Sequence, residues 1–508
     1  MNEETSTMTE TKFQFREKSF NELITDFKSS IKKAFHEVDK IDDFCSTRGV
    51  PAPVMKELMS TNPLALTIPI EYGGFGGNVK QNIAFISAAS YESLALALTL
   101  GINNALFIQP FVKYGQPQVK QKVFDRFLNN SAMGGLMITE PDFGSDALNM
   151  QTSVTAFEKC YHIQGKKHWQ GLTGMADFWL LTGRMKSDSG DLMRDIEIFM
   201  CDVKAPNQQV KVDEYFENLG LYQIPYGLNH LDVQVPAANK LIPHTTGVKM
   251  LLDLLHRSRF QFPAMGLGFI QRMLDEAIAH TKERLVGNKK LFEYDQIQHR
   301  LSRLQANYTI CSAFCVKSAE VADIENDLSP LGFEANVIKS VTTDMMQESA
   351  QSLLQIVGAK GYKINHIAGR AIVDSRPFQI FEGSNDILFH QIADAVIKMM
   401  KTAKESDLYK FLSGLTPRIV EMIKELISFD FNTQLSQRKL VEFGQIMSRI
   451  FSMELVAQAQ DRGFREDLSV NALTLLKQDV SILLNGFRMQ NPTCVVESYQ
   501  SDSYWFDL

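Results

Sequence analysis

The chain has 508 residues, of which 44% are hydrophobic and 22% are charged, a balance typical of a soluble globular protein with more than one domain core. Its net charge of -7, without any basic block, argues against a nucleic-acid partner. The six cysteines lack the paired spacing of a zinc site or a disulfide framework, so the sequence predicts no metal site and favours a reducing compartment.

The start of the chain is polar and acidic, unlike a secretory signal or an Arg-rich transit peptide. The most apolar stretch, residues 94–107, is interrupted by Asn103 and Asn104, and no uninterrupted run reaches the length of a spanning helix. We therefore expect a cytoplasmic protein.

Helical periodicity dominates the chain up to about residue 130. Phe20, Leu23 and Phe27 fall on one apolar stripe. The glycines of I-P-I-E-Y-G-G at residues 68–74 interrupt this pattern and let the backbone approach a neighbour closely, although a structural loop between two helices explains them nearly as well. The pattern predicts an N-terminal helical domain over residues 1–130.

Short apolar runs separated by turns follow, and they are typical of β-strands. Y-H-I-Q-G-K-K at residues 161–167 and H-L-D-V-Q-V at residues 230–235 alternate between apolar and polar side chains. We predict a β domain over residues 131–245. Periodicity alone does not decide between a sandwich and a barrel.

Helical periodicity returns over residues 246–400 and predicts a helix bundle. Within it, R-P-F-Q-I-F-E-G-S-N-D-I-L-F-H at residues 376–390 places one carboxylate, Glu382, between an apolar run and a glycine, just before a helix start. A carboxylate beside Ile380 and Phe381 loses water, which raises its pKa and suits a general base. A solvent-facing glutamate at a helix N-terminus is the alternative.

Residues 401–508 have the pattern of amphipathic helices and an aromatic tail. Most such helices pack on the parent fold, and a membrane or partner role is the less favoured alternative. The helices are predicted over residues 412–430, 440–457 and 473–487, and the aromatic residues are Tyr499, Tyr504, Trp505 and Phe506.

Several motifs, taken together and in this order, resemble the acyl-CoA dehydrogenase family, flavoenzymes of fatty-acid metabolism that desaturate acyl thioesters. They are residues 68–74, I-T-E-P-D-F-G-S-D at 138–146, I-Q-G-K-K-H-W at 163–169, Q-I-V-G-A-K-G-Y at 355–362 and E-G-S at 382–384. The resemblance covers residues 15 to 400, and the remainder is similar to the extension of the very-long-chain branch. It implies a mostly α fold with a central β-barrel domain, a four-helix bundle and a C-terminal helical extension.

The resemblance also assigns roles to residues. Glu382 would be the catalytic base, and its backbone N–H would bind the thioester carbonyl, with Ser145, Arg259 and Gly383 also on the substrate. FAD would be the cofactor, bound partly by a neighbouring subunit in a homodimer or homotetramer. The FAD-binding residues would be Ile138, Thr139, Ser145, Trp169, Arg284, Gln296, Gln355, Gly358, Ala359 and Ser384.

The sequence also departs from the family. Ser258 stands where some members carry the base, which favours Glu382. Gly171 replaces a hydroxyl that would contact flavin N5, Val286 and Gly287 replace other flavin contacts, and Phe389 replaces the last arginine of the loop.

Three functions stay open. The first is an acyl-CoA dehydrogenase that passes electrons to an electron-transferring flavoprotein or another acceptor. The second is a flavin oxidase or monooxygenase, or an enzyme that acts on acyl groups held by a carrier protein. The third is a non-catalytic member of the family.

Overall fold

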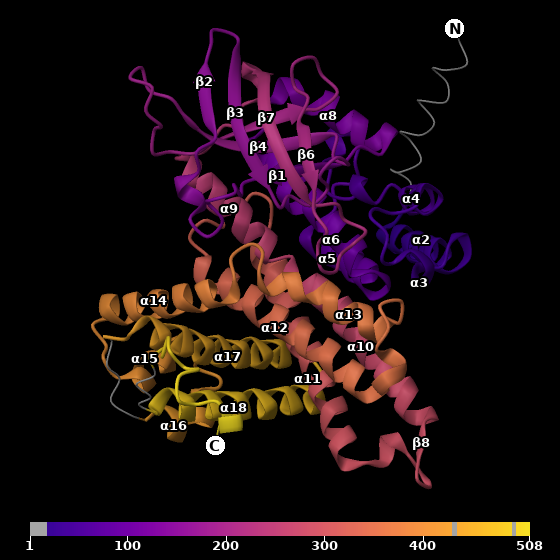
Figure 1. Cartoon of the computed structure of the whole chain (residues 1–508), viewed down its shortest axis with the longest axis vertical. Coiled ribbons are helices and arrows are strands. Elements are labelled where there is room, and N and C mark those ends of the chain that lie inside the picture. Colours follow the sequence, from indigo (N-terminus) through magenta and orange to yellow (C-terminus); the bar gives the residue numbers. More distant parts are fainter. Residues whose placement is uncertain (1–17, 429–433, 490–493, 508) are drawn as a thin grey trace.

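The computed structural model describes residues 18–428, 434–489 and 494–507. A curled sheet and the N-terminal helices lie at one end of the molecule, and long helices of the C-terminal half form the other end (Figure 1). The chain is mostly helical with one central β region and C-terminal helices, so the predicted fold class is confirmed.

The N-terminal helices bury apolar side chains, and three of them also have a capping side chain at their start. At the start of the first described helix, Ser19 and Glu22 make a reciprocal capping box, and Leu23, Phe27 and Ile31 face the core. The helices are α2 (Phe20–Lys33), α3 (Ile41–Phe44), α4 (Ala52–Met59), α5 (Val79–Glu92), α6 (Leu94–Asn103), α7 (Gln109–Tyr114) and α8 (Pro117–Asn130), and a π-helical turn (Asn104–Ile108) joins α6 to α7.

Among the described residues, the segment Leu94–Tyr114 is long and apolar enough to cross a membrane, but 89% of its apolar window is buried inside the fold. Its two asparagines make internal hydrogen bonds. Asn103 Oδ1 accepts from the Gly134 N–H at 2.7 Å, and Asn104 Oδ1 accepts from the Thr67 hydroxyl at 2.8 Å. These hydrogen bonds therefore connect the core helix to neighbouring segments.

The β region is a seven-stranded sheet in the order β1-β4-β2-β3-β7-β6, with β5 paired to the other side of β4. β1 and β2 run parallel to β4, and the remaining pairs are antiparallel. Across the described ranges no pairing joins β6 to β1 or β5, so the predicted barrel is a half-barrel. The strands are β1 (Gly134–Met137), β2 (Ser153–Ala156), β3 (Cys160–His168), β4 (Phe178–Met185), β5 (Glu197–Asp202), β6 (Lys211–Tyr215) and β7 (Gly227–Pro236).

A bundle of long helices follows the sheet. α10 packs against α11 and α12, and α12 packs against α14. The last residue of α12 is followed by Gly358, whose φ of 72° stops the helix. The elements are α9 (Gly247–Arg259), α10 (Phe262–Glu283), the hairpin β8 (Leu285–Val286) and β9 (Lys289–Lys290), α11 (Asp295–Val321), α12 (Gly332–Val357), α13 (Ile367–Ser375) and α14 (Asn385–Ala403).

The C-terminal extension packs on this bundle. α17 lies along α14, and α18 lies against α11. The helix predicted over residues 412–430 is wrong, because the chain breaks at Thr416 and Pro417 into two short helices, and residues 429–430 lie outside the described ranges. The helices are α15 (Leu408–Leu415), α16 (Val420–Ile427), α17 (Gln437–Asp461) and α18 (Glu466–Arg488).

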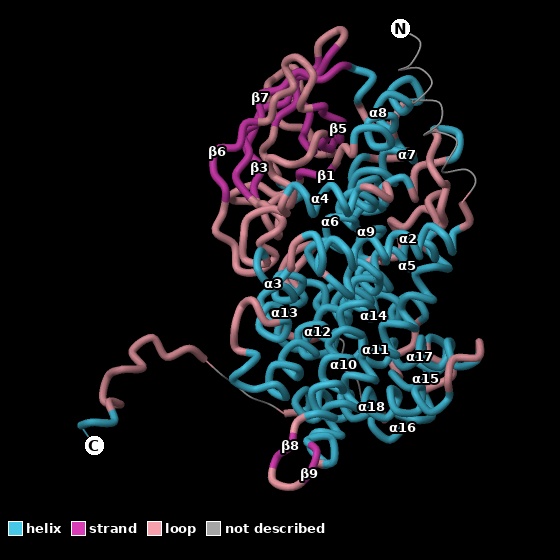
Figure 2. Tube along the Cα trace, turned by 90° about the vertical axis from the view of Figure 1, so that its right-hand side faces the viewer, coloured by secondary structure: helices cyan, strands magenta, loops and turns pink. Residues whose placement is uncertain are grey.

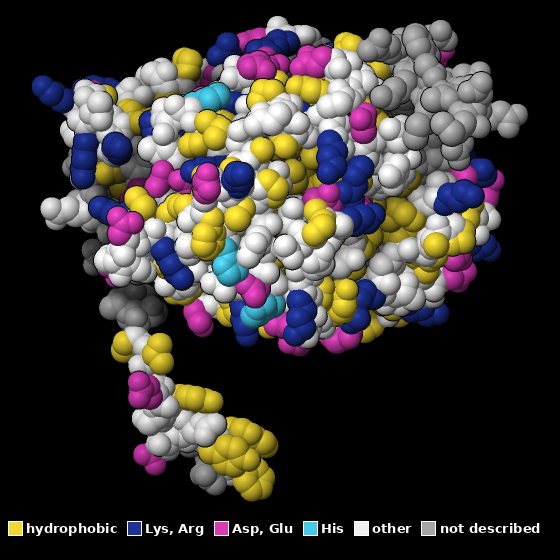
Figure 3. All heavy atoms as spheres, turned by 90° about the horizontal axis from the view of Figure 1, so that it is seen from above, with side chains coloured by type: hydrophobic (Ala, Val, Ile, Leu, Met, Phe, Trp, Pro, Cys, Tyr) yellow, Lys and Arg dark blue, Asp and Glu magenta, His cyan; other side chains and the backbone are white. Residues whose placement is uncertain are grey.

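Residues 494–507 stand away from the body of the molecule (Figure 2). Their aromatic side chains are exposed, Trp505 at 74% and Phe506 at 72%, and they form an apolar group at the end of the tail (Figure 3). On the face of the body drawn in the same view, basic and acidic side chains are interspersed (Figure 3).

Candidate active site

The segment 376–384 joins α13 to α14 and carries Glu382 in an uncommon backbone conformation. Glu382 has a φ of 54° and Gly383 a φ of 92°. A left-handed conformation costs a residue with a side chain about 1–3 kcal/mol, and it persists where neighbouring groups fix it, often at functional sites. We call residues 379–385 the catalytic loop, after the role that the sequence predicts for Glu382.

The carboxylate of Glu382 is enclosed. Its Oε1 accepts a hydrogen bond from the Ser258 hydroxyl at 2.6 Å, whereas Oε2 is buried and has no partner among the described residues. Phe378 and Phe381 pack with ring centroids 4.9 Å apart, and Phe262 lies against both. Burial raises the pKa of Glu382, and the Ser258 hydrogen bond and nearby cations oppose that shift. The carboxylate is therefore oriented by one oxygen and free to take a proton on the other.

Two buried cations hold the backbone of the catalytic loop. Arg259 donates to the Glu382 carbonyl oxygen from Nη2 at 2.8 Å and from Nε at 3.2 Å. Lys339 Nζ donates to the Gly383 carbonyl oxygen at 2.9 Å and to Asn385 Oδ1 at 3.0 Å. Burial and the nearby Arg259 charge lower the pKa of Lys339 to about 7. These contacts fix the two peptide groups that follow Glu382. The predicted contact of Arg259 with substrate stays a prediction.

Three of the predicted flavin contacts lie where two strands of the sheet end. Ile138 and Thr139 follow β1, and Trp169 follows β3. The Thr139 carbonyl accepts from the His168 N–H at 2.9 Å and from Gln170 Nε2 at 3.2 Å, which brings residues 138–139 beside Trp169. Trp169 has a φ of 61°, and its side chain is exposed although its ring centroid lies 4.5 Å from that of Phe216. A large aromatic ring held at the surface is available to a planar ligand.

Ser145 is exposed in the turn that follows residues 138–140, and Ser384 precedes α14 as its N-cap residue. Ser384 is half-buried. Their predicted roles with substrate and flavin stay predictions.

Sequence reasoning missed a buried ion pair beneath the flavin contacts. Lys167 is fully buried, and its Nζ donates to Glu140 Oε1 at 3.0 Å and to the Ile138 carbonyl at 2.9 Å. Burial lowers the pKa of Lys167. The alternation of β3 offered the signal, because Ile163 and Lys167 share the inward face of the strand.

Gly171 lies in a confined place. A Cβ at this position would be 2.8 Å from Ile102 Cδ1, so a larger residue requires that side chain to shift. The nearest hydroxyl in sequence, that of Thr173, is fully buried, donates to the Gln170 carbonyl and accepts from Asn229 Nδ2. Thr173 therefore has internal partners and is poorly placed to replace the missing hydroxyl.

The other predicted FAD contacts lie at the far end of the bundle. α10 has 22 residues, so its two ends are about 33 Å apart, and the exposed Arg284 follows its far end. The end of α12 borders an open hollow of about 710 Å³. We call this region the distal surface; its predicted FAD-binding residues are Arg284, Gln296, Gln355, Gly358 and Ala359, all exposed.

The distal surface also includes a histidine that the sequence did not single out. His280 Nε2 is buried, and no partner for it occurs in the part of the chain that the structure describes. Burial and the neighbouring charges of Arg284 and Lys360 lower the pKa of His280. A neutral ring beside two cations is suited to hydrogen bonding with an anionic or polar ligand.

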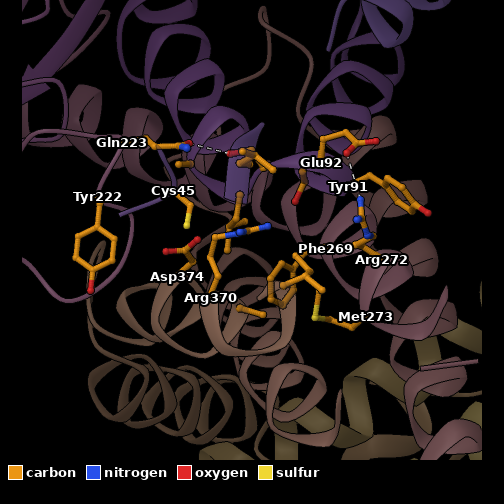
Figure 4. Close-up of a pocket in the computed structure, with 17 residues that line it drawn as sticks. Cys45, Tyr91, Glu92, Tyr222, Gln223, Phe269, Arg272, Met273, Arg370 and Asp374 are labelled. Carbon is orange, nitrogen blue, oxygen red and sulfur yellow. Dashed lines mark hydrogen bonds and ion pairs between the residues drawn. The ribbon is translucent and has the colours of Figure 1, made fainter. Parts of the chain in front are cut away.

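A small enclosed pocket lies between the α5–α6 junction, α10, α13 and the segment around Tyr222 (Figure 4). Its volume of about 20 Å³ is enough for about one water and too small for an acyl chain. Asp374 lies at its edge and accepts from the Leu221 N–H at 2.6 Å. Burial raises the pKa of Asp374 to about 6.

Three domain models of one family match the chain in order. They are the acyl-CoA dehydrogenase N-terminal domain at residues 21–131, its middle domain at residues 135–233 and its C-terminal domain at residues 245–397. An acyl-CoA dehydrogenase of Bacillus subtilis (strain 168) is 26% identical over 72% of this chain and 93% of its own length. The mitochondrial very long-chain specific acyl-CoA dehydrogenase of Rattus norvegicus is 23% identical over 70% of this chain and 55% of its own length.

Solved structures have the same fold. An acyl-CoA dehydrogenase from Bacillus anthracis, complexed with FAD, has a TM-score of 0.77 at 16% identity and covers 93% of this chain and 88% of its own. The butyryl-CoA dehydrogenase of Megasphaera elsdenii has a TM-score of 0.65 at 22% identity and covers 74% of this chain and 98% of its own. Together with the motifs and the catalytic loop, these matches identify the chain as an enzyme of the acyl-CoA dehydrogenase family, whose cofactor is FAD.

Proposed function

We propose that this enzyme desaturates an acyl-CoA thioester between its α and β carbons, with Glu382 as the general base. The observation that supports this most strongly is the buried and unpartnered Oε2 of Glu382, on a carboxylate oriented by Ser258 within the described fold. A base that is already dehydrated and correctly oriented gains proton affinity without reorganisation during the reaction.

In the proposed reaction Glu382 Oε2 removes a proton from the α carbon while a hydride leaves the β carbon, and an α,β-unsaturated thioester remains. FAD, when bound, supplies the acceptor for that hydride. Residues of this chain orient and dehydrate the base. Ser258 holds one carboxylate oxygen, and the aromatic rings of Phe262, Phe378 and Phe381 exclude water from the carboxylate.

The thioester carbonyl would be bound by the backbone N–H of Glu382, as the family resemblance implies. The positive φ of Glu382 turns the backbone at this point, and Arg259 and Lys339 hold the next two carbonyl groups. A donor on a fixed backbone stabilises developing negative charge on the carbonyl oxygen better than a mobile one.

The residues present fit FAD. The exposed Trp169 ring and the turn at residues 138–145 offer a surface for the isoalloxazine, and the distal surface offers an arginine, a glycine-lined hollow and the orphaned Nε2 of His280. The distal surface lies beyond the far end of α10, about 33 Å along the helix from Phe262, which packs beside Phe381 next to Glu382. We infer that a second copy of the chain completes each site.

The test is Glu382→Gln, with Glu454→Gln as the control because Glu454 is also an enclosed carboxylate but lies in the extension. Acyl-CoA thioesters from short to long are screened with the FAD-loaded enzyme and an artificial electron acceptor. Glu382→Gln should keep FAD and lose at least about a hundredfold in rate, the typical contribution of a general base. A rate above about a tenth of wild type in Glu382→Gln would contradict the proposal.

A second candidate uses the same site with oxygen as acceptor or with a carrier-bound acyl group. Gly171 favours it, because the hydroxyl expected at flavin N5 is missing and that of Thr173 is occupied. We predict that Gly171→Thr slows reoxidation of the substrate-reduced enzyme by oxygen. The variant needs Ile102→Val beside it to relieve the short contact, and Ile102→Val alone is the control. An unchanged reoxidation rate in the double variant would show that Gly171 has no such effect.

A further inference from the structure

The C-terminal extension touches the helix that begins at the catalytic loop. α17 approaches α14 so closely that a Cβ at Gly444 would overlap the carbonyl oxygen of Phe389. Close to this crossing, Arg449 of α17 places its guanidinium carbon 5.9 Å from the centre of the Phe389 ring. The same guanidinium donates from Nη2 to Asp344 Oδ2 at 3.0 Å, and both side chains of this pair are largely buried.

Asp344 connects this arginine to the catalytic loop. Its Oδ1 accepts from Gln379 Nε2 at 2.8 Å and from Asn385 Nδ2 at 2.7 Å, and these two residues flank Glu382 at equal separation along the chain. Asn385 Oδ1 in turn accepts from Lys339, which also binds the Gly383 carbonyl. An unbroken series of charged and polar contacts therefore runs from the extension to both ends of the loop.

The family resemblance places an arginine at position 389, and this chain has a phenylalanine there. Phe389 is buried at 2% exposure and carries no charge, so it cannot pair with the carboxylate of Asp344. The cation beside that carboxylate comes instead from a residue 60 positions further along the chain, Arg449.

We propose that Arg449 is a positioning residue for the catalytic loop, supplied by the extension in place of the family's arginine at position 389 of α14. It orients Asp344, Asp344 holds Gln379 and Asn385, and the loop keeps the carboxylate of Glu382 at its place. The extension thus takes part in the proposed desaturation through the loop, without touching substrate. This inference rests on the proposed function for its kinetic part.

The variants are Arg449→Met, which keeps the length of the side chain and removes its charge, and Arg449→Lys, which keeps the charge. The matched control is Asp479→Asn. Asp479 pairs with Arg303 and joins the extension to α11 at similar exposure, but its partners do not contact the catalytic loop.

Two measurements on the FAD-loaded enzyme separate positioning from general packing. The first is amide hydrogen exchange of residues 379–388, which should rise in Arg449→Met and stay at the wild-type level in Arg449→Lys and Asp479→Asn. The second is turnover of the best acyl-CoA thioester: Arg449→Met should lower kcat about tenfold and change KM less than about twofold, because loop geometry and not binding is altered.

The inference is overturned if exchange of residues 379–388 is unchanged in Arg449→Met, or if Asp479→Asn raises it equally. Failure of the proposed function looks different, since the wild-type enzyme would then turn over none of the thioesters tested. Even in that case hydrogen exchange decides whether Arg449 orders the loop.

Discussion

The catalytic loop and the distal surface carry similar side chains in opposite settings. Around Glu382 the cations are buried, and Arg259 and Lys339 each bind a carbonyl oxygen of the loop. On the distal surface, Arg284 is exposed and Gln355 lines an open hollow. A buried charge without partners is costly, so the first region must be complete within one chain, whereas the second is open to a ligand and a second copy.

The difference separates two tasks of the proposed function. Proton abstraction depends on contacts within one chain, and we infer that retention of FAD depends on contacts between chains. Variants of the two regions should therefore fail in different ways, in rate near Glu382 and in cofactor content at the distal surface.

The largest effect is expected for Lys339→Met. The Gly383 carbonyl loses its donor and Asn385 Oδ1 keeps only the Thr343 hydroxyl, so the loop no longer holds Glu382 in place, and kcat should fall about a hundredfold. FAD content, measured from the flavin absorbance per chain, should stay at the wild-type level. Lys398→Met removes an exposed lysine of α14 and serves as the control. Equal losses of FAD content and of kcat in Lys339→Met would contradict the proposed division of tasks between the two regions.

Arg284→Ala should produce the opposite pattern. Loss of a charged hydrogen-bond donor to a diphosphate costs about tenfold in affinity or more, so FAD content and oligomer content should fall together. Gel filtration with flavin absorbance measures both. Lys289→Ala, on the neighbouring hairpin, is the control, and full FAD occupancy in Arg284→Ala would show that this arginine lies outside the site.

The pH dependence of Ser258→Ala tests whether Ser258 stabilises the ionised carboxylate of Glu382. The Ser258 hydroxyl stabilises the ionised Glu382, so its removal should raise the pKa of Glu382 beyond the value that burial already gives. Because the base must be ionised, activity of the variant should rise at higher pH than that of wild type. The loss should be severalfold on the acidic side and small at alkaline pH. Identical pH profiles of kcat would contradict this assignment.

The smallest effect is expected at Asp374, between the two regions. Its pKa in the folded state, about 6, lies above the ordinary value of 3.8, so the folded state favours the protonated form. The ionised carboxylate therefore destabilises the fold above about pH 6, and this cost disappears below the ordinary value.

Asp374→Asn keeps an acceptor for the Leu221 N–H and cannot ionise, so it should raise the free energy of unfolding at pH 8 by about 3 kcal/mol and leave it nearly unchanged at pH 4. Thermal unfolding at both pH values measures this, with the exposed Asp386→Asn as control. A gain of the same size at both pH values would argue against an ionised Asp374.

The sequence predicted that Glu382 lies in a loop just before a helix, because Glu382, Gly383 and the helix start lie next to one another in the chain. It could not show that Ser258 donates to Glu382, since that contact joins residues 124 positions apart and depends on the fold. Lys339 was missed for a related reason: a lysine in a helical pattern is usually solvated, and only the packing of α12 against the loop buries it. At Thr416 and Pro417 the apolar periodicity continued across a proline, and the steric break outweighed it.

The open distal surface has a consequence for how the enzyme behaves on dilution. If each FAD is held between two chains, then by mass action cofactor affinity rises with protein concentration, and FAD in turn tightens the association of the chains by the same factor. Dilution would therefore release flavin and separate subunits together, while the catalytic loop of each chain stayed folded. The amount of this protein in the cell would then set the fraction of it that carries cofactor.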